Sequence, residues 1–384
     1  MDTSFDVVVL GVGSMGSAAC YHLAKRGVRV LGLEQSSIVH EFGSHYGQSR
    51  IIRKAYFEHP DYVPLLKRSY ELWSELEQET RYRLYTETGL LYAGRRDSVL
   101  MKGVRESASI HGIPIEHLDH GQLGKKYPAF KLHPSHEIIF EPGAGFLEPE
   151  RCIDAHVDCA KALGAQIQTH EKVLGWKKSG SGFEVTTNKG VYSAGKLVLT
   201  AGAWMGGLLP EISQKLKVTR QTVFWMATKH PELFSPARFP CWLAEMESSG
   251  DVYYGFPQLE AGSYGPLDGL KIAQHNPGLT TDPDSVDRMV SAAEKDAMRA
   301  VMEEIFPGEY AGLLHTKVCL YTYSPDEHFI IDVSTEDPNL IFAAGFSGHG
   351  FKFCSVVGEA LADLAEEGKS LLPIEFLSSK RFNQ

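Results

Sequence analysis

The sequence predicts a mixed α/β fold, α+β overall, in which a domain built on a βαβ unit is interleaved with a second, mostly antiparallel β domain. Three observations predict this fold. A strand–helix–strand pattern occupies the first 34 residues, strand-like segments dominate the middle of the chain, and α/β character returns further along. The length of 384 residues suits two or three domains of about 150 residues each.

The first unit is recognisable element by element. Residues 6–10 (DVVVL) form a short β-branched run, which predicts a buried strand. Residues 14–26 predict a helix, which ends at Gly27 after a basic pair. Residues 28–34 (VRVLGLE) predict a second strand that ends in an acid. This order of elements implies a parallel pair of strands.

The remaining elements follow from hydrophobic periodicity. Apolar residues at helical spacing predict a surface helix over residues 62–80. A loop rich in Gly and Pro is expected at residues 260–269. The other expected helices cover 149–163 and about 355–367, and the expected strands cover 89–93, 137–141, 183–187, 196–201, 252–256, 270–273 and 339–344.

The two predicted domains are both discontinuous, because patterns typical of the first unit recur after the β-rich middle. The expected division assigns residues 1–86, 150–217 and 320–384 to the first domain, and residues 87–149 and 218–319 to the second.

Composition excludes several classes of protein. With 38 basic and 48 acidic residues, the net charge of −10 has the wrong sign for a nucleic-acid binder. The six cysteines are scattered, without the spacing of a disulfide scaffold or a zinc site, which suits a reducing compartment. Neither a signal peptide nor an apolar run of membrane-spanning length is recognisable. We therefore expect a cytoplasmic protein with no membrane or nucleic-acid partner.

A nucleotide fingerprint lies between the first strand and the first helix. The sequence GVGSMG at residues 11–16 satisfies G-x-G-x-x-G, whose glycines allow a tight turn, the approach of a pyrophosphate and close packing of helix on strand. The helix N-terminus attracts the diphosphate. Glu34, at the end of the second strand, can accept hydrogen bonds from ribose hydroxyls. These residues predict a Rossmann-like dinucleotide domain, but they do not distinguish FAD from NAD.

Two other motifs are rejected, one because of its spacing and one because of a residue. In HEFGSH, the histidines His40 and His45 are five residues apart and Gly43 interrupts any helix, so we reject a zinc hydrolase and expect no metal site. In GFSGH, His349 replaces the last Gly of G-x-S-x-G, so Ser347 is a poor nucleophile candidate.

Three longer motifs carry a resemblance over nearly the whole chain. They are GSHYGQSRIIR at residues 43–53, KVCLYTYSPDEHFIID at 317–332 and AGFSGHGFK at 344–352. In these motifs the sequence resembles the monomeric sarcosine oxidase family, which includes sarcosine, N-methyltryptophan and pipecolate oxidases and, more distantly, fructosyl-amine oxidases. The resemblance implies a D-amino-acid-oxidase-like fold and covalently attached FAD.

The resemblance also implies roles for single residues. Cys319 matches the cysteine joined by an 8α-S-cysteinyl thioether to the flavin, and an inward-pointing Lys317 could lower the pKa of that thiol. Arg53 and Lys352 match the pair that holds the substrate carboxylate. Lys271 matches the lysine that promotes the reaction of reduced flavin with oxygen.

The resemblance implies roles for further residues. Arg50 matches a residue close to the flavin ring, and Tyr254, His275 and Tyr321 match the lining of the substrate cavity. The expected cofactor contacts are Gly11, Gly13, Ser14, Met15, Gly16, Glu34, Gln35, Gly43, Ser44, Ser49, Arg50, Val173, Trp204, Cys319, Gly348, His349, Gly350 and Lys352.

The expected activity is oxidation of a secondary amino acid by O2, with sarcosine or another N-methyl amino acid as first choice and formaldehyde, the demethylated amino acid and H2O2 as products. Pipecolate, N-methyltryptophan and fructosyl amino acids are alternative substrates, because Tyr46, Leu243 and the loop at 260–269 depart from the sarcosine oxidases. An NAD-dependent dehydrogenase and a flavin-retaining protein without turnover are rivals of another class. The family implies a monomer.

Overall fold

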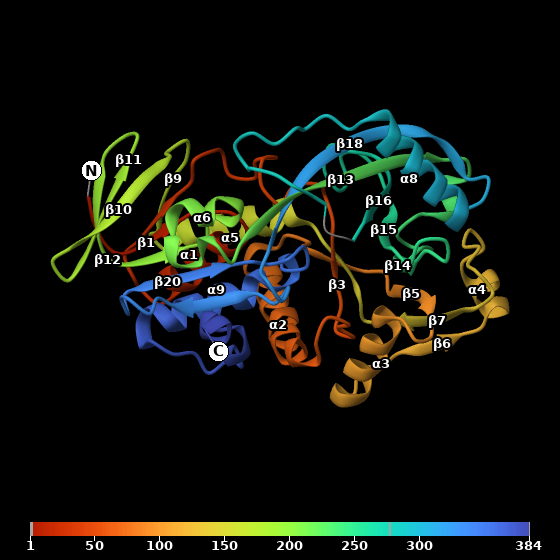
Figure 1. Cartoon of the computed structure of the whole chain (residues 1–384), viewed down its shortest axis with the longest axis horizontal. Coiled ribbons are helices and arrows are strands. Elements are labelled where there is room, and N and C mark those ends of the chain that lie inside the picture. Colours follow the sequence, from red (N-terminus) through yellow and green to blue (C-terminus); the bar gives the residue numbers. More distant parts are fainter. Residues whose placement is uncertain (1–2, 276–277, 384) are drawn as a thin grey trace.

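The computed structural model describes residues 3–275 and 278–383. Two large β-sheets lie at opposite ends of the molecule, and helix α2 (Val63–Thr80) lies near the middle of the view (Figure 1). Both chain ends lie on the side of the first sheet. Within the described ranges, no helix has the length and apolar character needed to cross a bilayer.

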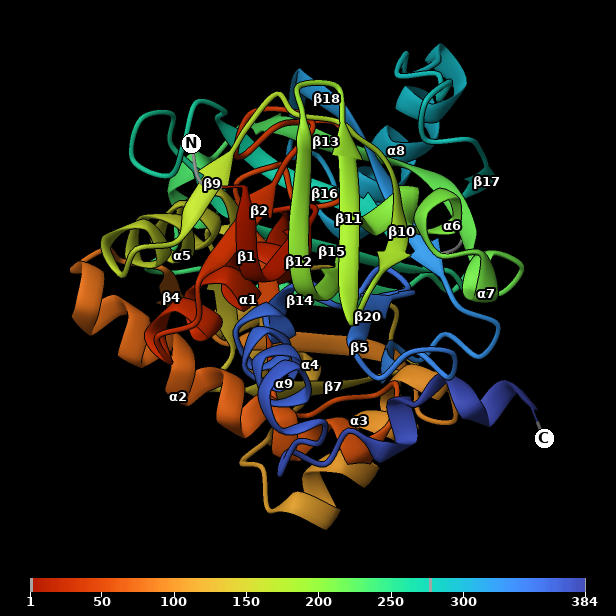
Figure 2. The ribbon, with the colours of Figure 1, turned by 90° about the vertical axis from the view of Figure 1, so that its left-hand side faces the viewer.

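The first sheet has eight strands in the order β10-β11-β12-β1-β2-β9, with β20 beside β12 and β19 beside β20 (Figure 2). The expected βαβ unit is confirmed, because β1 and β2 are parallel and helix α1 joins them. The bounds are β1 Ser4–Leu10, α1 Ser14–Lys25, β2 Val30–Leu33, β9 Gln166–Gln168, β10 Val173–Ser179, β11 Gly182–Thr187, β12 Val191–Leu199, β19 Ile330–Val333 and β20 Leu340–Ala344.

Each face of the first sheet has its own core, as the alternation of side chains along a strand requires. Val7 and Val9 of β1 belong to the cluster that includes α1, α5 (Pro149–Ala162) and α9 (Cys354–Glu367). Val8 and Leu10 belong to the opposite cluster, under the short helices α6 (Met205–Leu208) and α7 (Pro210–Ser213).

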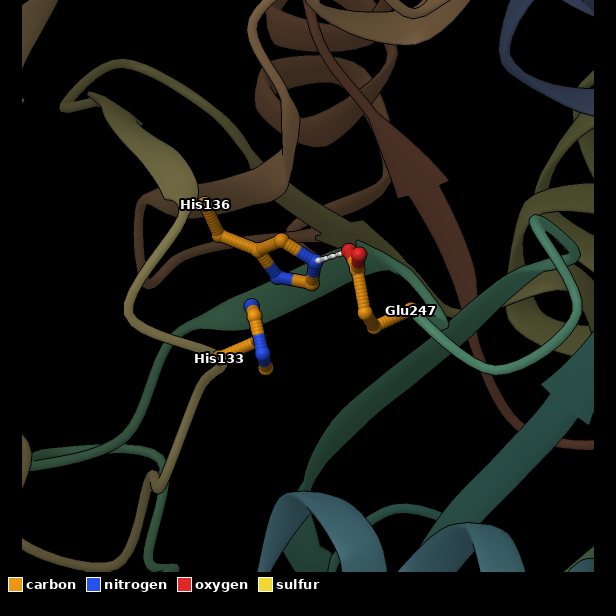
Figure 3. Close-up of side chains that lie close together, drawn as sticks. All are labelled: His133, His136 and Glu247. Atoms are coloured by element: carbon orange, nitrogen blue, oxygen red, sulfur yellow. Dashed lines mark hydrogen bonds and ion pairs between the residues drawn. The ribbon is translucent and has the colours of Figure 1, made fainter.

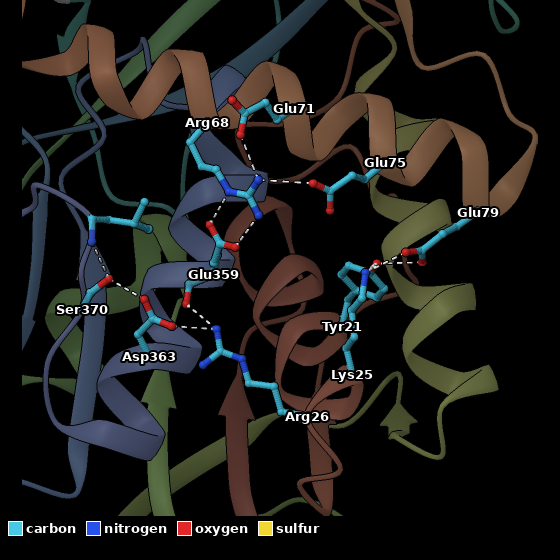
Figure 4. Close-up of polar contacts among 11 residues, drawn as sticks. Tyr21, Lys25, Arg26, Arg68, Glu71, Glu75, Glu79, Glu359, Asp363 and Ser370 are labelled. Atoms are coloured by element: carbon cyan, nitrogen blue, oxygen red, sulfur yellow. Dashed lines mark hydrogen bonds and ion pairs between the residues drawn. The ribbon is translucent and has the colours of Figure 1, made fainter.

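Charged side chains join α1, α2 and α9 on the outside of this layer (Figure 4). Arg68 of α2 donates to both carboxylate oxygens of Glu359 in α9, at 2.9 and 2.7 Å, and also to Glu71 at 2.9 Å. Arg26, just after α1, pairs with Asp363 of α9 at 2.6 Å. Networks of this kind fix the relative positions of helices better than isolated surface pairs do.

The second sheet has nine strands in the order β17-β13-β16-β15-β14-β5-β7-β6, with β18 paired to β13. Its described pairs are antiparallel except β14 with β5. The bounds are β5 Leu90–Arg95, β6 Glu116–Leu118, β7 His136–Glu141, β13 Lys217–Thr228, β14 Cys241–Glu245, β15 Val252–Leu259, β16 Gly269–Gln274, β17 Leu279–Thr280 and β18 Tyr310–Tyr323.

The two faces of this sheet differ in what covers them. On β13, Phe224 and Met226 face an aromatic core that includes helix α8 (Ala292–Ile305). Their neighbours Val223 and Trp225 face the other way, toward Tyr46 in the chain segment between the sheets. The second face therefore borders the space between the two sheets.

A small third sheet lies in the chain segments that connect the large ones. Strand β8 (Gly145–Leu147) pairs with both β3 (Arg50–Ile52) and β4 (Tyr85–Glu87). It fixes the backbone of the segment that carries Arg50 and Arg53. The chain is completed by α3 (Val99–His111) and α4 (His120–Lys126) and by 3-10 turns.

The expected elements all occur, and their ends lie within five residues of the expected ones. The helix expected at 149–163 is α5, and the helix expected at about 355–367 is α9. Residues 260–268 carry no strand or helix, in agreement with the expected loop. The expected list lacks helices α3 and α8 and the long antiparallel pair β13–β18, all of which belong to the second sheet and its cover.

Candidate active site

A cavity of about 360 Å³ opens where the parallel strands of the first sheet end. Its walls include residues at or just after the carboxyl ends of β1, β2, β12 and β20, the edge at which open α/β sheets bind ligands. Leu320, Tyr321 and Thr322 of β18 form part of the wall. The cavity therefore lies between the first sheet and a strand of the second.

Two of the three fingerprint glycines, Gly11 and Gly16, are required by close contacts. Gly11 has φ +92°, and a Cβ there would lie 2.8 Å from Cα of Ala201. A Cβ on Gly16 would lie 1.9 Å from the carbonyl oxygen of Gly11, so α1 packs directly on the turn. No side chain caps the N-terminus of α1 at Gly13, which leaves its N–H groups to a ligand. These features fit a dinucleotide diphosphate.

Glu34 lies directly after β2. Its side chain is buried in the cavity wall and accepts hydrogen bonds from the backbone N–H of Val12 at 3.1 Å and of Ser36 at 2.9 Å. Trp204 lines the same cavity and donates to Asp284 at 2.8 Å. Gln35, Gly43, Ser44 and Val173 also line it, as expected for cofactor contacts.

Two histidines of the rejected zinc motif belong to this wall. His40 and His45 both line the cavity, with ring centroids 4.9 Å apart, and His40 Nε2 lies 3.6 Å from Glu34. Burial, and secondly the neighbouring His40, lowers the pKa of His45 to about 3, so its ring is neutral. Sequence reasoning missed this role, although the position of HEFGSH just after the acid of β2 offered a signal.

Arg50 brings a positive charge to the cavity wall. Its guanidinium donates to the backbone carbonyls of Ser44 at 2.8 Å, Tyr46 at 2.7 Å and Ser49 at 2.8 Å. Across residues 3–275 and 278–383 it forms no ion pair with a carboxylate. Its charge therefore remains available to an anionic ligand.

Lys271 is buried beside the same loop because side chains alternate along β16. Leu270 and Ile272 face the aromatic core, so Lys271 faces the space between the sheets, where only 1% of it is exposed. Its ammonium donates to the carbonyls of Gly47 at 2.6 Å and Ser49 at 2.7 Å. Burial, and secondly the charge of Arg50, lowers the pKa of Lys271 well below its ordinary value.

The loop that receives Lys271 is held from the other side. Glu150, at the start of α5, accepts hydrogen bonds from the backbone N–H groups of Gly47 at 2.6 Å and Gln48 at 3.0 Å. Gln48 has a φ of +66°, and its amide accepts from Trp225 at 3.0 Å. These contacts stabilise a backbone conformation that a side chain rarely adopts.

Three further predicted residues share the face of Lys271. Tyr254 of β15 and Tyr321 of β18 bring their hydroxyls to within 3.5 Å of each other. Cys319, two residues before Tyr321, is buried in the cluster with Trp225, and its thiol lies 3.8 Å from the carbonyl oxygen of Tyr46. The period of two along β18 thus places Cys319 and Tyr321 on one face.

Lys317 does not fulfil the expectation of an inward-pointing neighbour of Cys319. Its ammonium pairs with Glu41 at 2.5 Å, and one third of its side chain is exposed. Because a carboxylate already neutralises this charge at the surface, Lys317 is a weak electrostatic influence on the thiol.

Arg53 and Lys352 come together around the ring of Tyr56, although they are 299 residues apart. The guanidinium carbon of Arg53 lies 4.3 Å from the ring centroid, and the ammonium of Lys352 lies 5.2 Å from it. Both side chains are buried. The segment that carries Arg53 is fixed by the buried Glu141, which accepts from the backbone N–H of Lys54 at 2.7 Å.

Lys352 is held from α2 and from its own turn. Its carbonyl accepts hydrogen bonds from Ser69 at 2.5 Å and from Trp73 at 3.1 Å, and its ammonium donates to the carbonyl of His349 at 2.7 Å. Burial, and secondly the charge of Arg53, lowers the pKa of Lys352 to about 7. An anion that binds next to Lys352 would therefore raise this pKa and favour the ammonium form.

The turn before Lys352 lies against Tyr321. Gly348 has φ +81°, and a Cβ there would lie 2.3 Å from the Tyr321 ring. Gly348 and Gly350 line the cavity, but the His349 ring turns away and contacts Tyr56 Oη at 2.5 Å and the carbonyl of Glu327 at 3.0 Å. Burial lowers the pKa of His349 to about 3.

The predicted site residues fall into two adjoining groups. One group lines the cavity directly: Gly11, Gly13, Ser14, Met15, Glu34, Gln35, Gly43, Ser44, Arg50, Val173, Trp204, Tyr321, Gly348 and Gly350. The other lies behind or beside its wall: Gly16, Ser49, Arg53, Tyr254, Lys271, His275, Cys319, His349 and Lys352. The ring of His275 lies 6.1 Å from those of Tyr254 and Phe57, and burial lowers its pKa to about 4.

Comparison with known proteins agrees with this geometry. Residues 6–364 match the family of proteins described as FAD dependent oxidoreductase. This match favours FAD over NAD, a choice that the glycine fingerprint leaves open. Over 386 aligned residues the chain is 40% identical to a monomeric sarcosine oxidase from Bacillus sp. (strain NS-129), with 99% of this chain and 98% of that protein covered.

Two further relatives extend the comparison. An N-methyl-L-tryptophan oxidase from Yersinia pestis (strain Pestoides F) is 32% identical over 98% of this chain and 99% of its own length. Among solved structures, NikD, an amino acid oxidase essential for nikkomycin biosynthesis, has a TM-score of 0.86 and 25% sequence identity, and the match covers 98% of both chains. The described fold is therefore shared along its whole length.

Proposed function

The chain belongs to the family of FAD-dependent oxidoreductases, and from this premise we propose that it is an oxidase of secondary amino acids, with sarcosine or another N-methyl amino acid as substrate. The products would be formaldehyde, the demethylated amino acid and H2O2, formed from the substrate, O2 and one water molecule. The observation that carries the proposal is the pair of buried cations, Arg53 and Lys352, gathered around Tyr56. Buried cations of this kind are suited to a small carboxylate.

The cavity wall would hold FAD with its diphosphate at the N-terminus of α1 and its adenosine ribose at Glu34. Support comes from the steric need for Gly11 and Gly16 and from the uncapped helix end. The bound flavin supplies a two-electron acceptor for the amine C–H bond and passes the electrons to O2.

The protein's own residues would bind and orient the substrate. Arg53 and Lys352 would fix its carboxylate, so that rotation is restricted and the methylamine lies at a defined place. Tyr254, Tyr321 and His275 would form the walls around that group, and their rings exclude water. Burial keeps His275 neutral, so it adds no charge that would repel a protonated amine before binding.

Lys271 and Arg50 would act on the oxygen half of the reaction. Neither side chain has a carboxylate partner in the described ranges, and Lys271 is held rigidly by Gly47 and Ser49. A fixed charge in a site that excludes water stabilises negative charge as it develops on oxygen.

Cys319 is the proposed point of covalent attachment, through a thioether to the 8α carbon of the flavin. Burial raises the thiol pKa of all five other cysteines, Cys20, Cys152, Cys159, Cys241 and Cys354, which disfavours the reactive thiolate. Cys319 is also the cysteine whose strand neighbours, Leu320 and Tyr321, line the cavity.

The remaining expectations concern assembly, location and domains. We propose a monomer, in line with the name of the relatives at 40% identity, and a cytoplasmic protein, since all six cysteines are unpaired thiols. We also propose that residues 1–86, 150–217 and 320–384 form the FAD domain and that residues 87–149 and 218–319 form the substrate domain.

The test is release of H2O2 across a panel of sarcosine, other N-methyl amino acids, pipecolate, N-methyltryptophan and fructosyl amino acids. We expect the highest kcat/KM for an N-methyl amino acid, and no turnover of the corresponding amine that lacks a carboxylate. Equal rates with and without the carboxylate would contradict the role of the two cations. Oxidation of only pipecolate or only a fructosyl amino acid would move the substrate to that alternative.

A further inference from the structure

Two histidines and a glutamate lie close together beside strands β7 and β14 of the second sheet (Figure 3). His133 and His136 belong to the turn that leads into β7, and Glu247 to the turn that follows β14. One potential ligand atom from each side chain lies within 4.8 Å of the other two. None of the three lines the cavity described above.

Both turns are fixed by backbone hydrogen bonds, so the three side chains are presented from rigid supports. The N–H of His136 donates to the carbonyl of His133 at 3.0 Å, and His136 is paired with Arg95 in the ladder between β7 and β5. The turn of Glu247 is closed by Gly250, whose N–H donates to the carbonyl of Met246 at 2.8 Å.

His136 is the unusual member of the cluster. Only 4% of its side chain is exposed, its Nε2 lies 3.3 Å from a carboxylate oxygen of Glu247, and its Nδ1 has no hydrogen-bond partner in the described chain. A buried ring nitrogen without a partner is costly and calls for an explanation.

Glu247 has one ion-pair contact among the described residues, with His136. The nearby Arg95 is paired with Glu245. A cation that binds the two imidazoles would neutralise this carboxylate as well.

His133 is oriented by its own neighbour. Its Nδ1 is engaged by Ser135, at 2.7 Å from the hydroxyl and 3.3 Å from the backbone N–H, and Nε2 is the ring nitrogen that has no contact with Ser135. A hydrogen bond at the second ring nitrogen is a usual feature of metal-binding histidines.

We propose that His133, His136 and Glu247 bind one divalent transition-metal ion, with Zn²⁺ as the best match. Two imidazole nitrogens and one carboxylate oxygen, with water in the fourth position, are a ligand set that Zn²⁺ prefers, whereas Mg²⁺ and Ca²⁺ prefer oxygen ligands alone. The ion would link the turn before β7 to the turn after β14, across the intervening strand β5.

The experiment is titration of the tag-free, chelator-treated full-length protein with ZnCl2, followed by calorimetry, with MgCl2 as the control ion. We expect one Zn²⁺ per chain, no Mg²⁺, and a higher Tm in the presence of Zn²⁺. The exposed residues are the safest to change, so His133→Ala and Glu247→Gln are the test variants. Each should weaken Zn²⁺ binding by at least about tenfold.

The matched control is His230→Ala, which removes an exposed histidine that also pairs with a glutamate, Glu309, at 2.9 Å. This variant should bind Zn²⁺ as the unchanged protein does. The proposal would be overturned if the unchanged protein did not bind Zn²⁺, or if both test variants bound Zn²⁺ as tightly as the unchanged protein does. Because the readouts are stoichiometry and Tm, neither result depends on the oxidase activity.

Discussion

One guanidinium nitrogen of Arg53 donates to both carboxylate oxygens of Glu58, at 2.6 and 2.7 Å. Burial alone would raise the pKa of Glu58, but the facing Arg53 lowers it to about 2, so the carboxylate is charged. The proposed carboxylate-binding residue thus already has an internal partner, and an incoming substrate must share Arg53 with Glu58 or displace it.

Glu58→Gln should strengthen the binding of small carboxylates, because it removes the negative charge that competes for Arg53. The same change should lower the free energy of unfolding by about 1–3 kcal/mol, since a buried cation loses its charged partner. The dissociation constant of a carboxylate inhibitor and urea unfolding measure the two effects. Asp61→Asn, an exposed change in the following turn, is the control. An unchanged dissociation constant would contradict competition between Glu58 and the ligand.

Loss of the Lys352 proton should lower kcat/KM as the pH rises through about 7. Its pKa in the free protein is about 7, so the ammonium that attracts the carboxylate is lost as the pH rises through 7. This loss opposes the rise that comes from deprotonation of the substrate amine. Lys352→Met should raise KM by roughly tenfold to a hundredfold and abolish the inflection near pH 7, whereas Lys352→Arg should retain tight binding. Persistence of the inflection in the Met variant would assign it to another group.

Lys271→Met should slow the reaction of the reduced enzyme with O2 by roughly 10²- to 10³-fold, because a fixed charge near the developing anion is removed. Anaerobic reduction by substrate should change much less. Stopped-flow absorbance of the flavin measures both steps. Lys317→Met is the matched control, since that lysine lies on the second sheet but is neutralised by Glu41. A similar loss in both half-reactions would argue against a role specific to oxygen.

Cys319→Ala should yield a protein whose flavin dissociates on acid denaturation, whereas the flavin of the unchanged protein should remain in the precipitate. Cys241→Ala is the control, because Cys241 is also buried in the second sheet and its thiol pKa is raised to about 12. Absorbance of the supernatant measures the released flavin. Flavin retained by the Cys319 variant would place the covalent link at another residue.

Acid should destabilise the protein through four buried histidines, His22, His45, His156 and His349. Burial lowers the pKa of each to about 3, against about 6.5 in the unfolded chain, so the unfolded state binds more protons between those values. Stability is therefore retained above pH 6.5 and lost as the pH falls toward 3, by up to about 1.4 kcal/mol per pH unit for each histidine. Urea unfolding at several pH values measures the slope.

His156→Gln should reduce that slope, while a change at the exposed His120 should leave it unaltered. A slope that does not respond to His156→Gln would show that carboxylates account for the acid sensitivity instead.

The first sheet could be predicted from the sequence because its signals are local. Residues 6–34 contain a strand, a helix with its Gly stop and a second strand in unbroken order. The long pair β13–β18 could not be predicted in this way, since its partners are about 90 residues apart in the chain. Helix α8 did offer a signal, a capping box formed by Ser291 and Glu294, followed by apolar residues at helical spacing.

The candidate active site, too, could be predicted from the sequence only in part. Alternation along β16 and β18 is readable from sequence, but which face of the second sheet meets the first depends on packing. Glu58 was missed because its partner Arg53 is brought to it by a turn held by Glu141, a residue of another strand. No local pattern specifies such a contact.

The strand order of the first sheet also determines when its strands can pair during synthesis of the chain. Strand β1 pairs with β12, and β12 pairs with β20, so the third partner leaves the ribosome more than 300 residues after the first. Until β20 has been synthesised, that edge of β12 lacks its native partner, and an unpaired strand edge is prone to aggregation. We expect folding to be completed only after β20 has been synthesised, and to be slow, because these contacts join distant parts of the chain.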